Sequence, residues 1–102
     1  MREASSIKSK FLGDKIRAAL KKEKLLEVGN NIRKWRSLKG MKQEFLAGEL
    51  EISKVSISKI ETGKTDIPLN RLFEIASILN IKVQLLFSDP LSILQEIEKL
   101  SG

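Results

Sequence analysis

A short polar run, residues 53–59, carries side chains that could read a nucleic acid. Between inward-facing apolar residues it presents two ammonium groups, three hydroxyls and one isopropyl group, from Lys54, Val55, Ser58 and Lys59, flanked by Ser53 and Ser56. Lysine can donate to guanine O6 and N7, serine can bond to bases or phosphates, and valine can contact the methyl group of thymine. This combination suits a surface that enters the major groove of DNA.

Two short helical patterns must position this run. Residues 42–50 and 53–61 each show helical spacing, and a short turn separates them. Because helices this short cannot each form a core, they must share one. The residues expected in that core are Leu46, Ala47, Leu50, Ile52, Ile57 and Ile60. A plain helical hairpin would bury the same residues, so the polar outer face is what favours a helix-turn-helix.

The remaining patterns are also helical and predict an all-α fold. A basic helix is expected from Asp14, as N-cap, to Glu27, and it either continues or bends near Gly29. The following helix should end at Gly40, a residue type that suits the C′ position. Trp35 occupies a core position of that helix.

After the motif, residues 62–66 form a polar connection, and Pro68 is expected in the first turn of another helix. Its inward face comprises Leu69, Leu72, Ile75, Ala76 and Leu79. Asp89 and Pro90 suit the N-cap and N1 positions of a last helix, with an apolar stripe of Ile93, Leu94, Ile97 and Leu100.

The segment between these two helices, residues 81–87, alternates apolar and polar side chains. Such alternation suits a half-buried strand, but the run is also short enough for one or two helical turns. We favour the helix. A lone strand would pair with its own copy in a dimer.

Composition excludes most other functions. The 102 residues fit one small domain with an added tail or helix, and the chain has no Cys and no His. Disulfides, most zinc sites and the common nucleophile and base pairs are therefore excluded, so we expect no enzyme, metal or cofactor. No apolar run approaches the roughly 20 residues of a membrane span, and no signal peptide is evident, which predicts a cytoplasmic protein without membrane association.

The net charge of +6 is one-sided, since residues 1–39 carry +8 and residues 40–102 carry −2. Such asymmetry is expected of a nucleic-acid binder, although a solvated basic face gives the same count. Together with the surface suited to the major groove, it makes double-stranded DNA the expected partner. The N-terminal helix has three interpretations: packing on its own domain through Ile16, Leu20 and Leu26, extension of the phosphate-binding surface, or contact with another protein. We favour packing with a solvated basic face, formed by Lys8, Lys10, Lys15, Arg17, Lys21, Lys22 and Lys24.

The run NIRKWRSLKGMKQEFLAGELEISKVSISKIETGKT resembles the lambda-repressor and Cro type of helix-turn-helix protein, also called Xre-like. The resemblance covers about residues 28–87. It implies a five-helix domain whose third helix enters the major groove, in regulators that mostly bind operators as dimers. The expected organisation is then an N-terminal basic extension (1–27), a helix-turn-helix domain (28–88, motif 43–63) and a C-terminal amphipathic helix (89–102).

The resemblance also implies roles for single residues. Gln43 would bind a phosphate through its amide, and Ser53 would cap the recognition helix. Thr62 and Lys64 lie in a loop that contacts the DNA backbone in relatives. The positions that face the groove are Lys54, Val55, Ser58 and Lys59, with Ser56 beside Ser53.

A further pair, Arg36 and Glu61, matches an ion pair that ties the first helix of the family domain to the end of the third. Two residues depart from the family pattern. Glu51 replaces a usual glycine in the turn, so a residue with a Cβ must adopt that conformation at some cost. Lys54 replaces a usual glutamine, which favours guanine or phosphate over adenine.

We therefore predict a sequence-specific, dimeric DNA-binding transcriptional regulator whose dimer contact lies in residues 83–87 and the last helix. The alternative is the antitoxin of a toxin-antitoxin pair, which binds its own promoter and holds a toxin through residues 1–27 or 89–102. A toxin reading frame beside this gene, or co-purification of a partner through those termini, would distinguish the two.

Overall fold

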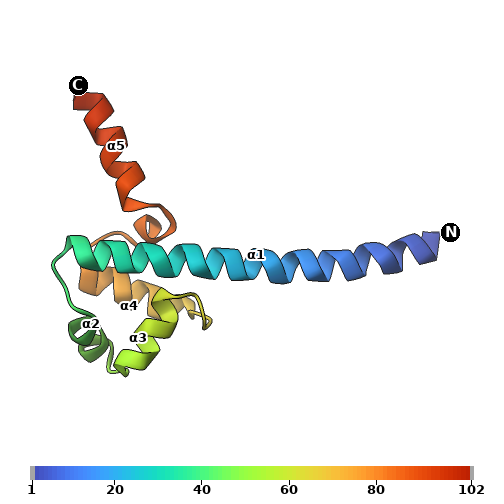
Figure 1. Ribbon diagram of the computed structural model, residues 1–102, viewed down its shortest axis with the longest axis horizontal. Helices are drawn as coiled ribbons and strands as arrows, with labels where there is room; N and C mark the ends of the chain where they lie inside the picture. The colour runs from blue at the N-terminus through green and yellow to red at the C-terminus, as the bar shows by residue number, and fades with distance from the viewer. Residues whose placement is uncertain (1, 102) are drawn as a thin grey trace.

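The computed structural model describes the backbone of residues 2–101 and the side chains of residues 12–100. Within that range the chain forms five α-helices and one 3-10 helix, with no strand (Figure 1). They are α1 (Arg2–Leu38), α2 (Gln43–Leu50), α3 (Lys54–Glu61), α4 (Leu69–Leu79), η1 (Val83–Phe87) and α5 (Pro90–Ser101). The predicted all-α fold is confirmed. No helix in the described range is both long and apolar enough to cross a bilayer.

Helix α1 is continuous over 37 residues, and its N-terminal half extends beyond the other helices (Figure 1). The predicted start at Asp14 is wrong, because the chain is helical from Arg2 and Asp14 lies inside α1. Gly29 does not end or bend the helix. A Cβ at Gly29 would overlap the backbone carbonyl of Ile60, so this glycine allows close packing of α3 on α1. The boundary expected between residues 27 and 28 lies inside this helix.

One core lies between the C-terminal half of α1 and the helices that follow it. Five of the six residues predicted for the motif core are buried, and Ile52 packs against them half-buried. Trp35 packs on the same core and donates its indole N–H to the carbonyl of Leu85 at 2.9 Å. The buried apolar residues are Ile32, Leu46, Ala47, Leu50, Ile57, Ile60, Leu72, Ile75, Ala76, Leu79 and Leu86.

The turn of the motif uses a left-handed residue with a side chain. Glu51 ends α2 at φ +57°, as its place in the turn implied, and this conformation costs about 1 kcal/mol for a residue with a Cβ. Its N–H bonds to Gly48, and the N–H of Ile52 bonds to Ala47, so the last carbonyls of α2 are satisfied. Gly40 closes α1 at φ +68°.

Residues 83–87 form η1, so the favoured helix is observed and the alternative strand is not. Asn31 donates its side-chain N–H to the carbonyl of Leu86 at 3.0 Å, which anchors η1 on α1. Helix α4 begins at Leu69, so Pro68 occupies its N-cap position and not its first turn, one residue before the predicted place.

Asp89 caps α5 and ties it to α1. Its Oδ1 accepts the N–H of Leu91 at 2.9 Å, and its Oδ2 accepts Lys34 Nζ at 2.9 Å. The hydrogen bond from Lys34, followed by the one from Leu91, lowers the pKa of the Asp89 carboxyl. The predicted N-cap is therefore observed.

Two apolar stripes stay uncovered. Helix α5 exposes Leu94, Ile97 and Leu100 of the predicted stripe, whereas Ile93 is half-buried. Helix α1 exposes Leu12, Ile16, Leu20 and Leu26. The prediction that the N-terminal helix packs on its own core is wrong. Leu26 lies two positions from the core residue Val28, which places the two side chains on opposite sides of α1. The side chains of Lys8 and Lys10 lie outside the described residues.

A nearly buried ion pair joins α3 to α1. Arg36 Nε lies 2.7 Å from Glu61 Oε2, and the side chains of the two residues are only 12% and 1% exposed. Arg36 also donates to the carbonyl of Met41 at 2.7 Å, and Gln43 Nε2 donates to Glu61 Oε1 at 2.9 Å. Arg36, Met41, Gln43 and Glu61, called here the Glu61 network, link the end of α1, the start of α2 and the end of α3.

Replacing Arg36 by methionine should destabilise the protein by about 3–5 kcal/mol, because the buried carboxylate of Glu61 would keep only the neutral donor of Gln43. Urea unfolding followed by circular dichroism measures this loss. Arg33→Met is the matched control, since Arg33 is exposed and its side chain donates to Asn30, and its effect should stay within about 0.5 kcal/mol. Equal losses in both variants would contradict a structural role for the pair.

Candidate nucleic-acid interface

Serine 53 sets the start of α3. Its backbone is extended, and its Oγ accepts the N–H of Ser56 at 3.1 Å, which satisfies a donor at the helix N-terminus. The two serine hydroxyls also share a hydrogen bond of 2.9 Å. Helix α3 therefore begins at Lys54, and the predicted capping geometry is present in the structure.

The outer surface of α3 gathers the side chains singled out in the sequence. Lys54, Val55, Ser58 and Lys59 are all exposed, and their spacing of one, three and one residues places them on one face. The opposite face of α3 buries Ile57, Ile60 and Glu61. Val55 is 64% exposed, so its methyl groups are accessible to a binding partner.

Thr62 and Lys64 follow α3 in the connection to α4, and both are exposed. Thr62 donates its hydroxyl to the carbonyl of Ser58 at 2.7 Å, and this bond closes the end of the helix. The oxygen of Thr62 still has capacity to accept a hydrogen bond, and Lys64 offers three donors.

The structure gives Gln43 a contact that the sequence analysis missed. One amide N–H of Gln43 is directed to Glu61, within the Glu61 network. Because the amide carries two N–H donors, the other remains for the predicted phosphate contact. Gln43 thus has a structural contact whether or not it binds DNA.

A second missed residue is Glu44, whose Oε1 lies 2.8 Å from Lys54 Nζ. The hydrogen bond from Lys54 and the bond to the Glu44 backbone lower the pKa of the Glu44 carboxyl. Both side chains are exposed, so water competes with the pair and another anion can replace Glu44. The feature of the sequence that could have indicated this contact is a carboxylate next to Gln43, at the exposed start of α2.

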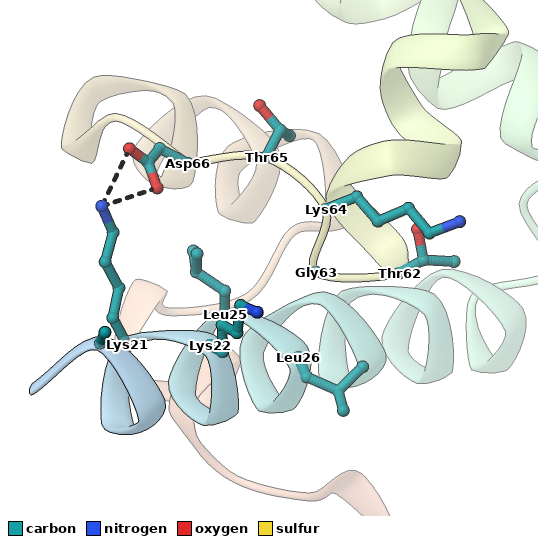
Figure 2. Close-up of a pocket in the computed structure, with 10 residues that line it drawn as sticks. Lys21, Lys22, Leu25, Leu26, Thr62, Gly63, Lys64, Thr65 and Asp66 are labelled. Carbon is teal, nitrogen blue, oxygen red and sulfur yellow. Dashed lines mark hydrogen bonds and ion pairs between the residues drawn. The ribbon is translucent and has the colours of Figure 1, made fainter. Parts of the chain in front are cut away.

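An open hollow of about 800 Å³ lies between α1 and the connection from α3 to α4 (Figure 2). Three lysines line it, Lys21 and Lys22 from α1 and Lys64 from the connection. Lys21 Nζ forms an ion pair with Asp66 at 3.3 Å, shown by dashed lines in Figure 2. The sequence alone does not indicate this contact, because its two sides lie about forty residues apart.

The family model for the helix-turn-helix matches residues 32–86, from the last turns of α1 to η1. An uncharacterised HTH-type transcriptional regulator of Sinorhizobium medicae is 39% identical over 64 residues, which is 63% of this chain and 46% of that protein. The chain thus spans less than half the length of that relative. A protein of the same description from Methanocaldococcus jannaschii is 36% identical over 58 residues, which is 57% of this chain and 88% of that protein.

Solved structures agree with this match. The restriction-modification controller protein C.AhdI of Aeromonas hydrophila superposes with a TM-score of 0.59 at 28% identity, over 62% of this chain and 96% of that one. A hypothetical transcription factor from Neisseria, NHTF, gives a TM-score of 0.64 at 26% identity, over 74% and 86% of the two chains. The chain belongs to the helix-turn-helix family of the Xre and lambda-repressor type, whose members are DNA-binding transcriptional regulators.

Proposed function

We propose that the protein is a sequence-specific transcriptional regulator that binds DNA as a dimer and places α3 in the major groove. The exposed face of α3 carries this proposal. That face combines hydrogen-bond donors, hydroxyls and one apolar group on a helix whose start is capped by Ser53 and whose end is fixed by Glu61. A rigidly held set of such side chains is what direct recognition of base pairs requires.

Lys54 is the residue with which base specificity is tested. Its ammonium group can donate to O6 and N7 of guanine, and a good contact of this kind contributes about 1–3 kcal/mol of discrimination. Lys64 lies outside α3, in the connection that follows, and is assigned to a phosphate. Substitutions of the two lysines should therefore lower affinity for specific and random DNA to different extents.

An operator for this test can be selected from a random pool of duplexes by the wild-type protein. Lys54→Ala should lower affinity for that operator about tenfold or more while changing affinity for random DNA much less. Lys64→Ala should weaken both DNAs by the same factor and make the log-log salt slope shallower by about 0.9. Equal losses on both DNAs for both variants would exclude a base-reading role for Lys54.

Glu44→Gln should strengthen binding to DNA in general, by roughly two- to fivefold at low salt. The substitution removes a carboxylate from the interface and releases Lys54 from its ion pair. Fluorescence anisotropy with operator and random duplexes measures the change. Glu49→Gln removes the same charge from an exposed position on α2 without an ion pair to Lys54, and should have a smaller effect. A gain no larger than that of the control would count against competition between Glu44 and DNA.

The dimer contact is assigned to η1 and α5. Phe87 is 59% exposed at the end of η1, and α5 exposes a stripe of Leu94, Ile97 and Leu100, with Leu91 on another side of the helix. Exposed large apolar side chains gathered in one part of a protein often mark a site of association. Asp89 and Lys34 fix the base of α5 to α1, so the stripe is held at a defined angle to the DNA-binding helices.

Leu94→Glu should convert the protein to a monomer without unfolding it, because Leu94 lies on the exposed stripe. Analytical ultracentrifugation at matched concentrations measures the change, with circular dichroism to confirm the helix content. Gln95→Glu introduces the same charge on the adjacent exposed position and should leave the dimer intact. A dimer that persists in Leu94→Glu would place the contact elsewhere.

A further inference from the structure

Residues spaced by seven along α1 form a row on one face of the helix. The row reads Lys15, Lys22, Gly29 and Arg36. Seven residues are nearly two complete helical turns, so each step shifts the direction by only about 20°. Its last two members meet α3, since Arg36 pairs with Glu61 and a Cβ on Gly29 would overlap the carbonyl of Ile60. Lys15 and Lys22 therefore lie on the side of α1 that faces α3, beyond the end of α3.

The connection after α3 brings Lys22 next to the expected phosphate-binding loop. Gly63 has φ +69°, and a Cβ there would lie 2.7 Å from the Cα of Leu26, so this turn rests directly on the α1 backbone. Lys22 lines the same hollow as Thr62 and Lys64 (Figure 2). The ion pair of Lys21 with Asp66 ties the far end of the connection to α1.

Asp66, an acidic residue that lines the hollow, is paired with Lys21, and the acidic neighbours of the two lysines on α1 lie off the row. The two acidic residues nearest to Lys22 in sequence, Glu23 and Glu27, lie about 100° and 140° around the helix from it. Lys15 and Lys22 are separated by about 10.5 Å along the helix axis, and each strand of DNA carries a phosphate every 3.4 Å of its axis. The two ammonium groups can therefore reach different phosphates of one strand.

We propose that Lys15 and Lys22 bind DNA phosphates beside those bound by the connection between α3 and α4, so that the N-terminal half of α1 lengthens the contact with the DNA backbone. The proposal rests on the DNA binding assigned above to α3. It gives this part of α1, which lies outside the matched family region, a role in affinity and none in base recognition.

The test compares two double variants of the full chain that remove the same charge from the same stretch of α1. Lys15→Gln with Lys22→Gln removes the two lysines of the row, whereas Arg17→Gln with Lys24→Gln removes two exposed cations from another side of the helix. Glutamine retains a high helix propensity, so α1 should persist in both. Affinity for the selected operator is measured between 50 and 200 mM salt.

Loss of two phosphate contacts should make the log-log salt slope shallower by about 1.8 in the Lys15 and Lys22 variant alone. The loss of affinity of the Lys15 and Lys22 variant relative to wild type should then become about twelvefold smaller as the salt concentration rises from 50 to 200 mM. Ethylation of DNA phosphates should still interfere with binding of the control variant at positions where it no longer affects the Lys15 and Lys22 variant. Preference for the operator over random DNA should be unchanged in both.

Equal salt slopes and equal interference patterns in the two double variants would overturn this proposal. The proposed role of α3 would still stand after that outcome, provided that the wild type selects an operator and Lys54→Ala lowers affinity for it. Failure of the wild type to select any sequence would instead contradict the proposed function. The two failures are therefore separated by the same set of measurements.

Discussion

The position of α3 depends on one buried charge. Glu61 ends the helix with a side chain that is 1% exposed, and a carboxylate removed from water in this way needs charged or polar partners. Arg36 and Gln43 supply those partners from α1 and α2. Because these bonds are directional, they fix the end of α3 against both helices, and the outer face of α3 follows from that orientation.

Close backbone contacts reinforce this arrangement. Gly29 and Gly63 allow the end of α3 and the following turn to lie against the backbone of α1. At the other end of the motif, Glu51 accepts a left-handed backbone so that α2 and α3 remain joined by a short turn. A buried ion pair and a strained turn both carry a free-energy cost, so the apolar core must provide the net stability. Their contribution is geometric, since they hold Lys54 and its neighbours in one orientation.

Local sequence patterns predicted the elements that depend on neighbouring residues. Apolar spacing predicted the buried positions of α2 to α4 except at Leu69, which was expected to face inward and is exposed. Ser53 and Asp89 marked helix starts through their capping chemistry. The pair of Arg36 and Glu61 came from family resemblance, because no local rule links residues 25 positions apart. The direction of the α1 stripe was missed, since an amphipathic pattern reveals that a face is apolar without saying which molecule covers it. The ion pair of Glu44 with Lys54 was missed for a similar reason, as it depends on how the two motif helices cross.

The pair of Glu44 and Lys54 bears on how the proposed regulator would distinguish DNA sequences. Lys54 Nζ lies 2.8 Å from Glu44 Oε1, and a glutamate is ionised at neutral pH, so Lys54 already has an anionic partner before DNA binds. DNA must then offer Lys54 an acceptor that replaces this partner. A sequence without a suitable acceptor would leave Lys54 on Glu44 and would place the Glu44 carboxylate close to the phosphates. In the proposed complex the pair would therefore penalise poorly matched DNA, and the Glu44 carboxylate beside α3 would contribute to specificity by repulsion as well as by holding the lysine in position.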